Sequence, residues 1–249
     1  MDLNRFVEGL AKTKLLYLDD SYLSRFEAKV VRKVREKRNC YVALDRTVFH
    51  PKSGGQPSDT GELRGPDFRM RVKKCMFCRG VVVHYGKLLD GEVADVIEGE
   101  IDWEWRYLVM KRHTAGHLLD GCISEVTGEP VRTLDSWLGD PCYVSYRGEA
   151  LGKADMDRVE EMANERIAQG GSVTIAYMGF EELMRRVPNA PNIFRLPKLE
   201  VYRVVTIEGF DPIPCGGTHV RDIAEISGVE IKEVTLDSAS FRVYYDVLH

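Results

Sequence analysis

Two pairs of potential metal ligands, each with a four-residue spacing, constrain what this chain can fold into. The first pair is His113 and His117, and the second, far along the chain, is Cys215 and His219. Helical side chains four residues apart project from the same face, so both histidines can reach one ion. The proline and glycines of PCGGTHV predict a turn for the second pair. A fold that uses both pairs must bring this turn to the helix.

The ligand types point to zinc. Three imidazoles and one thiolate form the nitrogen and sulfur set that zinc favours, and they disfavour magnesium and calcium. Each pair alone has a plainer explanation: HxxxH pairs arise often by chance, a cysteine is commonly buried as an apolar residue, and a histidine often hydrogen-bonds within a turn. Two matched pairs in a chain with six cysteines and six histidines predict one Zn²⁺ per chain, bound by His113, His117, Cys215 and His219.

The number of ligands leaves the role of the zinc open. A closed shell of four protein ligands is typical of a structural site, whereas catalysis requires an open position for water or substrate. A loosely bound ligand, a five-coordinate ion, or a second group that handles the water would reconcile the set with hydrolysis. The remaining chemical alternative is a nucleophilic Cys215 with His219 as its base, which zinc ligation of the thiolate disfavours.

The pattern of apolar and turn residues predicts an α+β fold. The first part of the chain alternates β-rich runs with dense turn signals, and we expect strands at residues 29–34, 39–48, 68–77 and 80–85. Helices are expected from an N-cap at Asp102 to about Val126 and at 152–169, with strands at 172–177, 201–207, 229–235 and 241–247, the last two as a hairpin. This order predicts a small, mostly antiparallel, barrel-like N-terminal domain at residues 1–98 and an α+β zinc-containing domain at 99–249.

Charge and composition restrict the partners. With 35 Lys and Arg against 39 Asp and Glu, the formal net charge is −4, so a nucleic acid can be held only by a local basic patch. Arg69, Arg71 and Lys73 alternate along a predicted strand, and we predict that their face contacts phosphates. A second basic cluster spans residues 32–38. No long apolar run opens the chain, which favours a cytoplasmic protein without a membrane segment and with reduced cysteines.

The ligand motifs carry a family likeness. RHTAGHLLDG at 112–121 and CGGTHV at 215–220 resemble the paired HxxxH and CxxxH motifs of the alanyl-tRNA synthetase editing domain and its free-standing AlaX relatives. The threonyl-tRNA synthetase editing domain shares this pattern. FHPKSGGQPSDTGEL at 49–63 is similar to the Gly-Gly-Gln segment of the medium-length AlaX proteins. The likeness covers nearly the whole chain, and no segment resembles the aminoacylation module.

The resemblance implies a function and a set of site residues. It implies an ATP-independent, zinc-dependent hydrolase that acts in trans on the ester of seryl-tRNA, and of glycyl-tRNA, formed by mistake on alanine tRNA. It implies the same four zinc ligands. It also implies catalytic roles for Thr133 and Gln56 and substrate contacts at Gly54, Gly55 and Thr218, although the two glycines alone indicate only a turn.

One segment departs from the family pattern, and two other functions stay open. After the zinc helix the family carries a Gly- and Ser-containing turn and an Arg-x-Asp-Phe strand, whereas this chain has PVRTLDSWLGDPCYVSYRG at 130–148. The alternatives are a nucleic-acid-binding module with a purely structural zinc and a zinc hydrolase of small esters or amides. The sequence determines neither the preferred amino acid nor the oligomeric state.

Overall fold

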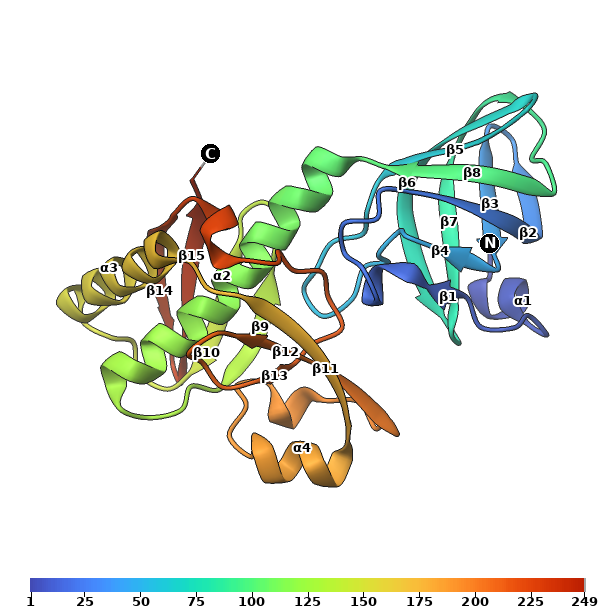
Figure 1. Cartoon of the computed structure of the whole chain (residues 1–249). Coiled ribbons are helices and arrows are strands. Elements are labelled where there is room, and N and C mark those ends of the chain that lie inside the picture. Colours follow the sequence, from blue (N-terminus) through green and yellow to red (C-terminus); the bar gives the residue numbers. More distant parts are fainter. Residues whose placement is uncertain (249) are drawn as a thin grey trace. The chain divides into compact units, whose positions relative to one another are not determined.

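The computed structural model of the chain describes residues 1–248. They form two compact units, Met1–Tyr107 and Leu108–His249, which are coloured blue to green and green to red in Figure 1. The boundary expected at 98/99 would cut strand β8 (Val96–Ile101), which pairs with two strands of the first unit. Within residues 1–248, no helix has both the length and the apolar character needed to cross a membrane.

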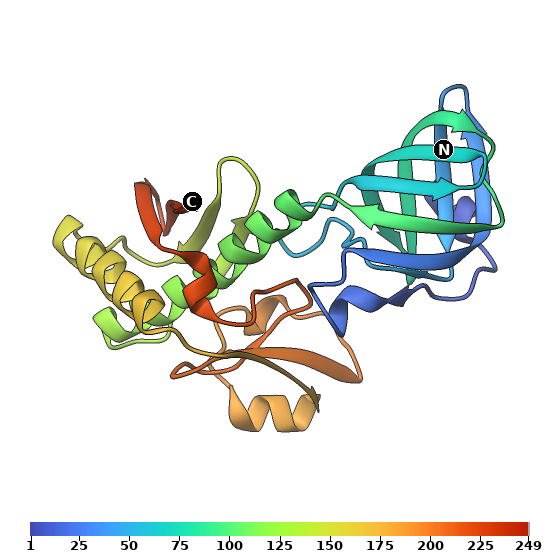
Figure 2. The same ribbon diagram turned by 45° about the horizontal axis from the view of Figure 1, so that its top comes forward.

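The first unit is a closed antiparallel barrel with the strand order β2-β3-β7-β6-β5-β8, and Figure 2 shows its strands closing into a ring. A short parallel pair, β1 and β4, and a short helix accompany it. The elements are α1 (Leu3–Val7), β1 (Lys14–Leu15), η1 (Leu16–Leu18), β2 (Arg25–Glu36), β3 (Asn39–Leu44), β4 (Arg46–Thr47), β5 (Gly61–Gly65), β6 (Phe68–Cys78), β7 (Val81–Gly91) and β8.

Alternation of apolar and charged residues builds the barrel core. In β6, Phe68, Met70 and Val72 are buried while Arg69 and Arg71 are exposed, as a period of two requires. The apolar side chains of the strands form one buried cluster inside the barrel. The first unit therefore has a hydrophobic core of its own.

The start of helix α2 (Trp103–Thr127) is fixed within the first unit. Asp102 caps it, because its Oδ1 accepts a hydrogen bond from the Trp105 amide at 3.2 Å. Arg106 is fully buried, and its guanidinium pairs with the carboxylate of Asp59 and donates to the carbonyl of Val48. A buried cation needs this complete set of partners, so the helix begins at a fixed place.

The second unit contains two sheets, the rest of α2, the helices α3 and α4, and two short 3-10 helices. The four-stranded sheet has the order β14-β15-β10-β9, and the three-stranded sheet has the order β11-β12-β13. The elements after α2 are β9 (Thr133–Trp137), β10 (Tyr143–Arg147), α3 (Lys153–Gln169), β11 (Val173–Gly179), α4 (Phe180–Arg186), η2 (Ile193–Arg195), β12 (Val201–Ile207), β13 (Ile213–Pro214), η3 (Ile223–Ile226), β14 (Val229–Asp237) and β15 (Ser240–Val247).

Close backbone approach places α2 on the four-stranded sheet. The Tyr245 hydroxyl on β15 donates to the carbonyl of Arg112 at 2.8 Å. A Cβ at Gly116 would lie 2.7 Å from that hydroxyl oxygen, so only glycine fits at this point of the helix. The contacts of Tyr245 hold α2 on the sheet along the stretch that carries the two histidines. Helix α3 is attached to the same sheet, because Asn164 exchanges two hydrogen bonds with the backbone of Val229 in β14.

The α+β fold class with a barrel-like first part is confirmed. Both predicted helices and the closing hairpin form within two residues of the expected ends. Six of the strands within residues 1–248 were not expected: the two-residue strands β1 and β13, and β5, β8, β9 and β10. The segments GELRG, VIEGEI and TLDSW contain glycine or acidic residues with low strand propensity, and pairing with neighbouring strands fixes them.

Candidate metal centre

Helix α2 presents the first pair of ligands. His113 and His117 lie one turn apart with ring centroids 5.0 Å from each other. His113 is buried and His117 is half-buried. The helix that the spacing predicted therefore places both imidazoles on one face, as expected for a shared ion.

A turn held by hydrogen bonds to Arg203 presents the second pair, Cys215 and His219. The turn follows β13, and the Cys215 amide donates to the carbonyl of Arg203 on β12 at 2.9 Å. The buried Arg203 guanidinium in return donates to the carbonyls of Cys215 and Gly217 at 2.8 and 3.0 Å. These bonds fix the path of the CGGTH segment, so the thiol and the His219 ring point to a defined place.

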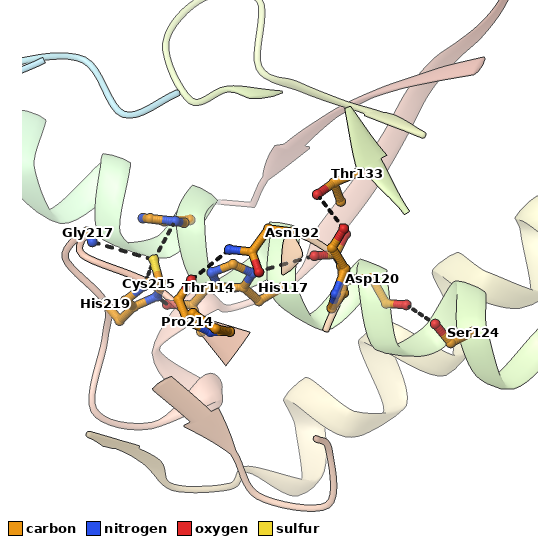
Figure 3. Close-up of polar contacts among 12 residues, drawn as sticks. Thr114, His117, Asp120, Ser124, Thr133, Asn192, Pro214, Cys215, Gly217 and His219 are labelled. Carbon is orange, nitrogen blue, oxygen red and sulfur yellow. Dashed lines mark hydrogen bonds and ion pairs between the residues drawn. The ribbon is translucent and has the colours of Figure 1, made fainter. Parts of the chain in front are cut away.

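All four predicted ligands come together, and Figure 3 labels three of them, His117, Cys215 and His219. Their ligand atoms lie within 4.8 Å of one another. The Cys215 Sγ is 3.4 Å from His113 Nε2 and 3.3 Å from His219 Nε2. The buried Nε2 of His117 has no hydrogen-bond partner within residues 1–248. A buried ring nitrogen without a partner beside a thiol and two further imidazoles fits a zinc ion.

Neighbouring side chains orient the two rings through their second nitrogens. The Thr114 hydroxyl donates to the carbonyl of Met110 at 3.0 Å and lies 3.2 Å from His219 Nδ1, so it accepts from that nitrogen. Asp120 Oδ2 lies 3.5 Å from His117 Nδ1. In both rings these contacts leave Nε2 as the atom available to a metal.

Electrostatics favours the metal-ligating forms of Cys215 and His219, whereas His117 is held protonated. Burial raises the pKa of the Cys215 thiol, but His113 and His219 outweigh it and hold this pKa well below its ordinary value. Burial together with His113 lowers the pKa of His219 to about 3. Burial also lowers the pKa of His117, yet Asp120 and Cys215 raise it to about 10. A thiolate and a neutral imidazole are metal-ligating forms, and binding at His117 would release its proton.

A cavity of about 450 Å³ adjoins the centre. His117 and Asp120 line it together with Ser124 of the same helix, Pro191 and Phe210. Its volume lies within the range of small-molecule sites. The aromatic ring of Phe210 packs on Gly121, where a Cβ would lie 2.2 Å from the ring. One candidate metal ligand, His117, therefore faces a space that can receive a small molecule.

Thr133 lies near this region with its hydroxyl already bonded. Its Oγ1 donates to the carbonyl of Pro191 at 3.1 Å and accepts from Arg195 Nη2 at 2.8 Å. Thr133 is buried and does not line the cavity beside His117. It does not line a second, adjoining cavity of about 600 Å³ either. Thr218 is buried between Gly217 and His219 in the ligand turn.

The Gly-Gly-Gln segment forms a tight turn in the first unit. Ser53 and Gln56 exchange backbone hydrogen bonds of 3.1 and 2.8 Å, and both Gly54 and Gly55 have positive φ, 56° and 85°. Positive φ at both central residues is characteristic of a type I′ turn. The Gln56 side chain is only 1% exposed.

The predicted basic face on β6 is exposed but partly neutralised. Arg69 and Arg71 approach Glu62 of the neighbouring strand β5 at 3.3 and 3.8 Å. Lys73 sits at a bulge, where the register with β7 shifts, and Lys73 and Lys74 are both exposed.

Sequence reasoning missed Asp120 and Asn192. Asp120 follows His117 by three residues, so it shares a helix face with it, which is a signal the sequence does contain. The hydroxyl of Tyr146 on β10 donates to Asp120 Oδ1 at 2.8 Å, which completes its burial. The Asn192 amide donates to the carbonyl of Pro214 at 2.6 Å, and nothing in the sequence marks this contact.

Two parts of the chain match family models of known protein domains. Residues 12–105 match the family model of class II (A) tRNA synthetases, and residues 202–240, which contain the Cys215 turn, match that of the threonyl and alanyl tRNA synthetase second additional domain. The first match covers the strands of the barrel, and the second covers the turn that carries Cys215 and His219, two of the four residues of the His/Cys centre.

The relatives narrow these matches to one family. The chain is 33% identical to an alanyl-tRNA editing protein AlaX-M of Methanosarcina barkeri, over 95% of this chain and 99% of that one. It is 33% identical to an alanyl-tRNA editing protein AlaX-L of Pyrococcus horikoshii over 87% of this chain and 53% of that one. An alanine–tRNA ligase of Methanococcus vannielii shares 31% identity over 89% of this chain but only 24% of its own. The chain belongs to the AlaX family of alanyl-tRNA editing proteins.

Proposed function

We propose that the protein hydrolyses the ester of wrongly charged alanine tRNA in trans, releasing serine and also glycine, with one Zn²⁺ at the His/Cys centre. The observation that carries this proposal is the convergence of His113, His117, Cys215 and His219 at the edge of a cavity that His117 itself lines. The AlaX-M and AlaX-L relatives carry the name of alanyl-tRNA editing proteins.

The residues of the chain can supply what this reaction needs. When bound, zinc supplies a Lewis acid that polarises a carbonyl and lowers the pKa of water. Asp120 and Thr114 orient His117 and His219 so that Nε2 of each faces the centre. Asp120 also gives the cavity a carboxylate, which suits the positively charged α-amino group of an aminoacyl ester. Such an ester is already activated, so the site requires no strong nucleophile of its own.

The test is release of serine from seryl-tRNA that carries the alanine anticodon and acceptor stem. We expect the protein to release serine, chelator to abolish release, and added Zn²⁺ to restore it. Alanyl-tRNA with the same RNA body is the matched control and should be spared. A protein that hydrolyses a small seryl ester as fast as seryl-tRNA would instead be a general esterase, and a metal-loaded protein that releases nothing would be a binding module.

A further inference from the structure

A second cavity, of about 600 Å³, adjoins the one beside the metal centre. The two cavities share a wall formed by residues 129–131 and 188–190. One cavity contains His117 and Asp120 and the other contains Arg132 and Arg147. The second cavity therefore lies beside the one that contains His117.

Two arginines of the second cavity, Arg132 and Arg147, are exposed and form no ion pair with any residue from 1 to 248. The Arg147 amide donates to the carbonyl of Arg132 at 2.9 Å, so the backbone holds these two residues next to each other. Two guanidinium groups without ion pairs within residues 1–248, on residues joined by a backbone hydrogen bond, are suited to bind the phosphates of a nucleic acid.

The same cavity presents an aromatic surface. Phe194 is 76% exposed, more than any other large apolar side chain within residues 1–248. The Arg132 guanidinium lies 5.0 Å from the centre of its ring. An exposed ring beside a cation is a typical stacking surface for an unpaired base. A pair of merely solvated arginines would not account for so exposed a phenylalanine.

The remaining polar residues of the cavity fit a ribonucleotide. Glu129 and Glu149 also line it, so charge alone does not select a simple anion. Carboxylates accept hydrogen bonds from ribose hydroxyls and from the amino group of cytosine. The arginines can bind phosphates, the Phe194 ring can stack on a base, and the carboxylates can accept hydrogen bonds from a nucleotide. Together these groups match single-stranded RNA more closely than an apolar small molecule.

We propose that the cavity of Arg132, Arg147 and Phe194 holds the single-stranded nucleotides that precede the aminoacylated terminal nucleotide. The ester then lies in the adjoining cavity beside His117. This inference rests on the proposed function, in that an aminoacylated RNA is the substrate. It also gives a role to the segment 130–148, whose sequence departs from the family pattern.

Binding of two labelled RNA hairpins by fluorescence anisotropy tests the proposal. Both carry the acceptor stem of alanine tRNA; one ends in its single-stranded 3′ tail and the other lacks the tail. We expect the parent protein to bind the tailed hairpin more tightly. Phe194→Ala should weaken binding of the tailed hairpin about fivefold or more. Arg132→Glu and Arg147→Glu should each flatten the log–log salt dependence by roughly 0.7 for every phosphate that the variant no longer binds.

The controls are Arg158→Glu, an exposed arginine on α3, and Phe77→Ala, an exposed phenylalanine on β6; neither residue lines the cavity. Both should leave the preference for the tail unchanged, and all variants should keep the parent's metal content. The proposal is overturned if the parent shows no preference, or if the three cavity variants retain it. A protein that prefers the tail through these residues but releases no serine would refute the proposed reaction and leave the RNA site standing.

Discussion

Asp120 links a metal ligand to the interior of the second unit. Its carboxylate accepts a hydrogen bond from the buried Tyr146 hydroxyl on one oxygen and faces His117 Nδ1 with the other. Tyr146 stacks on Phe241, with ring centroids 5.2 Å apart, so the carboxylate has little freedom to move. A carboxylate held in this way fixes both the tautomer and the orientation of a ligating imidazole.

We therefore expect Asp120→Asn to weaken zinc binding by about 10- to 100-fold, the usual effect of losing a carboxylate behind a ligating histidine. The side-chain volume is preserved, so the fold should persist. Competition with a chromophoric chelator measures the affinity. Asp157→Asn, on the exposed surface of α3, is the matched control and should bind zinc like the parent. An Asp120→Asn variant with unchanged affinity would show that Asp120 does not position His117.

The resemblance gives Thr133 a role in recognising the serine hydroxyl. Its own hydroxyl is bonded to Pro191 and Arg195, so binding serine requires one of these bonds to be exchanged. Thr133→Val keeps the volume and removes the hydroxyl. If Thr133 contacts serine, the variant should release serine more slowly by about 10-fold or more, on the order of the loss of one buried hydrogen bond, at unchanged zinc content. Equal rates on seryl-tRNA would exclude this role.

At the scale of elements, the sequence predicts what local signals determine. Helix α2 is predicted because Asp102, the apolar spacing and the Thr127–Gly128 stop agree, and the histidine pair follows from that helix. Strands β9 and β10 were missed because only their pairing with each other and with β15 stabilises them. The same limit applies to Asp120: its position on the helix is readable, but its partner Tyr146 lies on one of the missed strands.

The basic residues on β6 differ in how far their charge is compensated. Glu62 already partners Arg69 and Arg71, whereas Lys73 forms no ion pair within residues 1–248. If this face contacts tRNA phosphates, Lys73→Glu should flatten the log–log salt dependence of tRNA binding by roughly 0.9, and Arg69→Glu by less because its charge is partly compensated. Binding of uncharged tRNA from about 50 to 200 mM salt measures both slopes. Arg158→Glu on α3 is the control. Unchanged slopes for Lys73→Glu and Arg69→Glu would show that the β6 face does not contact tRNA phosphates.

For the whole molecule, the separation into two units with separate cores predicts which properties depend on a bound metal. The barrel encloses its own apolar cluster, and every candidate ligand lies in the second unit. The second unit also buries Leu118, Leu119 and Ile123 of α2 and further apolar residues of its sheets. Burial of this extent stabilises a fold without metal, unlike a zinc finger, which unfolds when the ion is removed.

Chelation should therefore abolish serine release before it unfolds either unit. Hydrogen exchange of the whole chain, with and without chelator, measures this. Amides of the Cys215–His219 turn and the Ile213 amide of β13 should exchange faster without metal, because their positions depend on ligation as well as on Arg203. Amides of the barrel and of α3 should stay protected, since their cores contain no ligand. Cys215→Ala should reproduce the pattern without chelator. Loss of protection throughout the second unit at the chelator concentration that stops serine release would instead identify the zinc as structural, as in a metal-stabilised RNA-binding module.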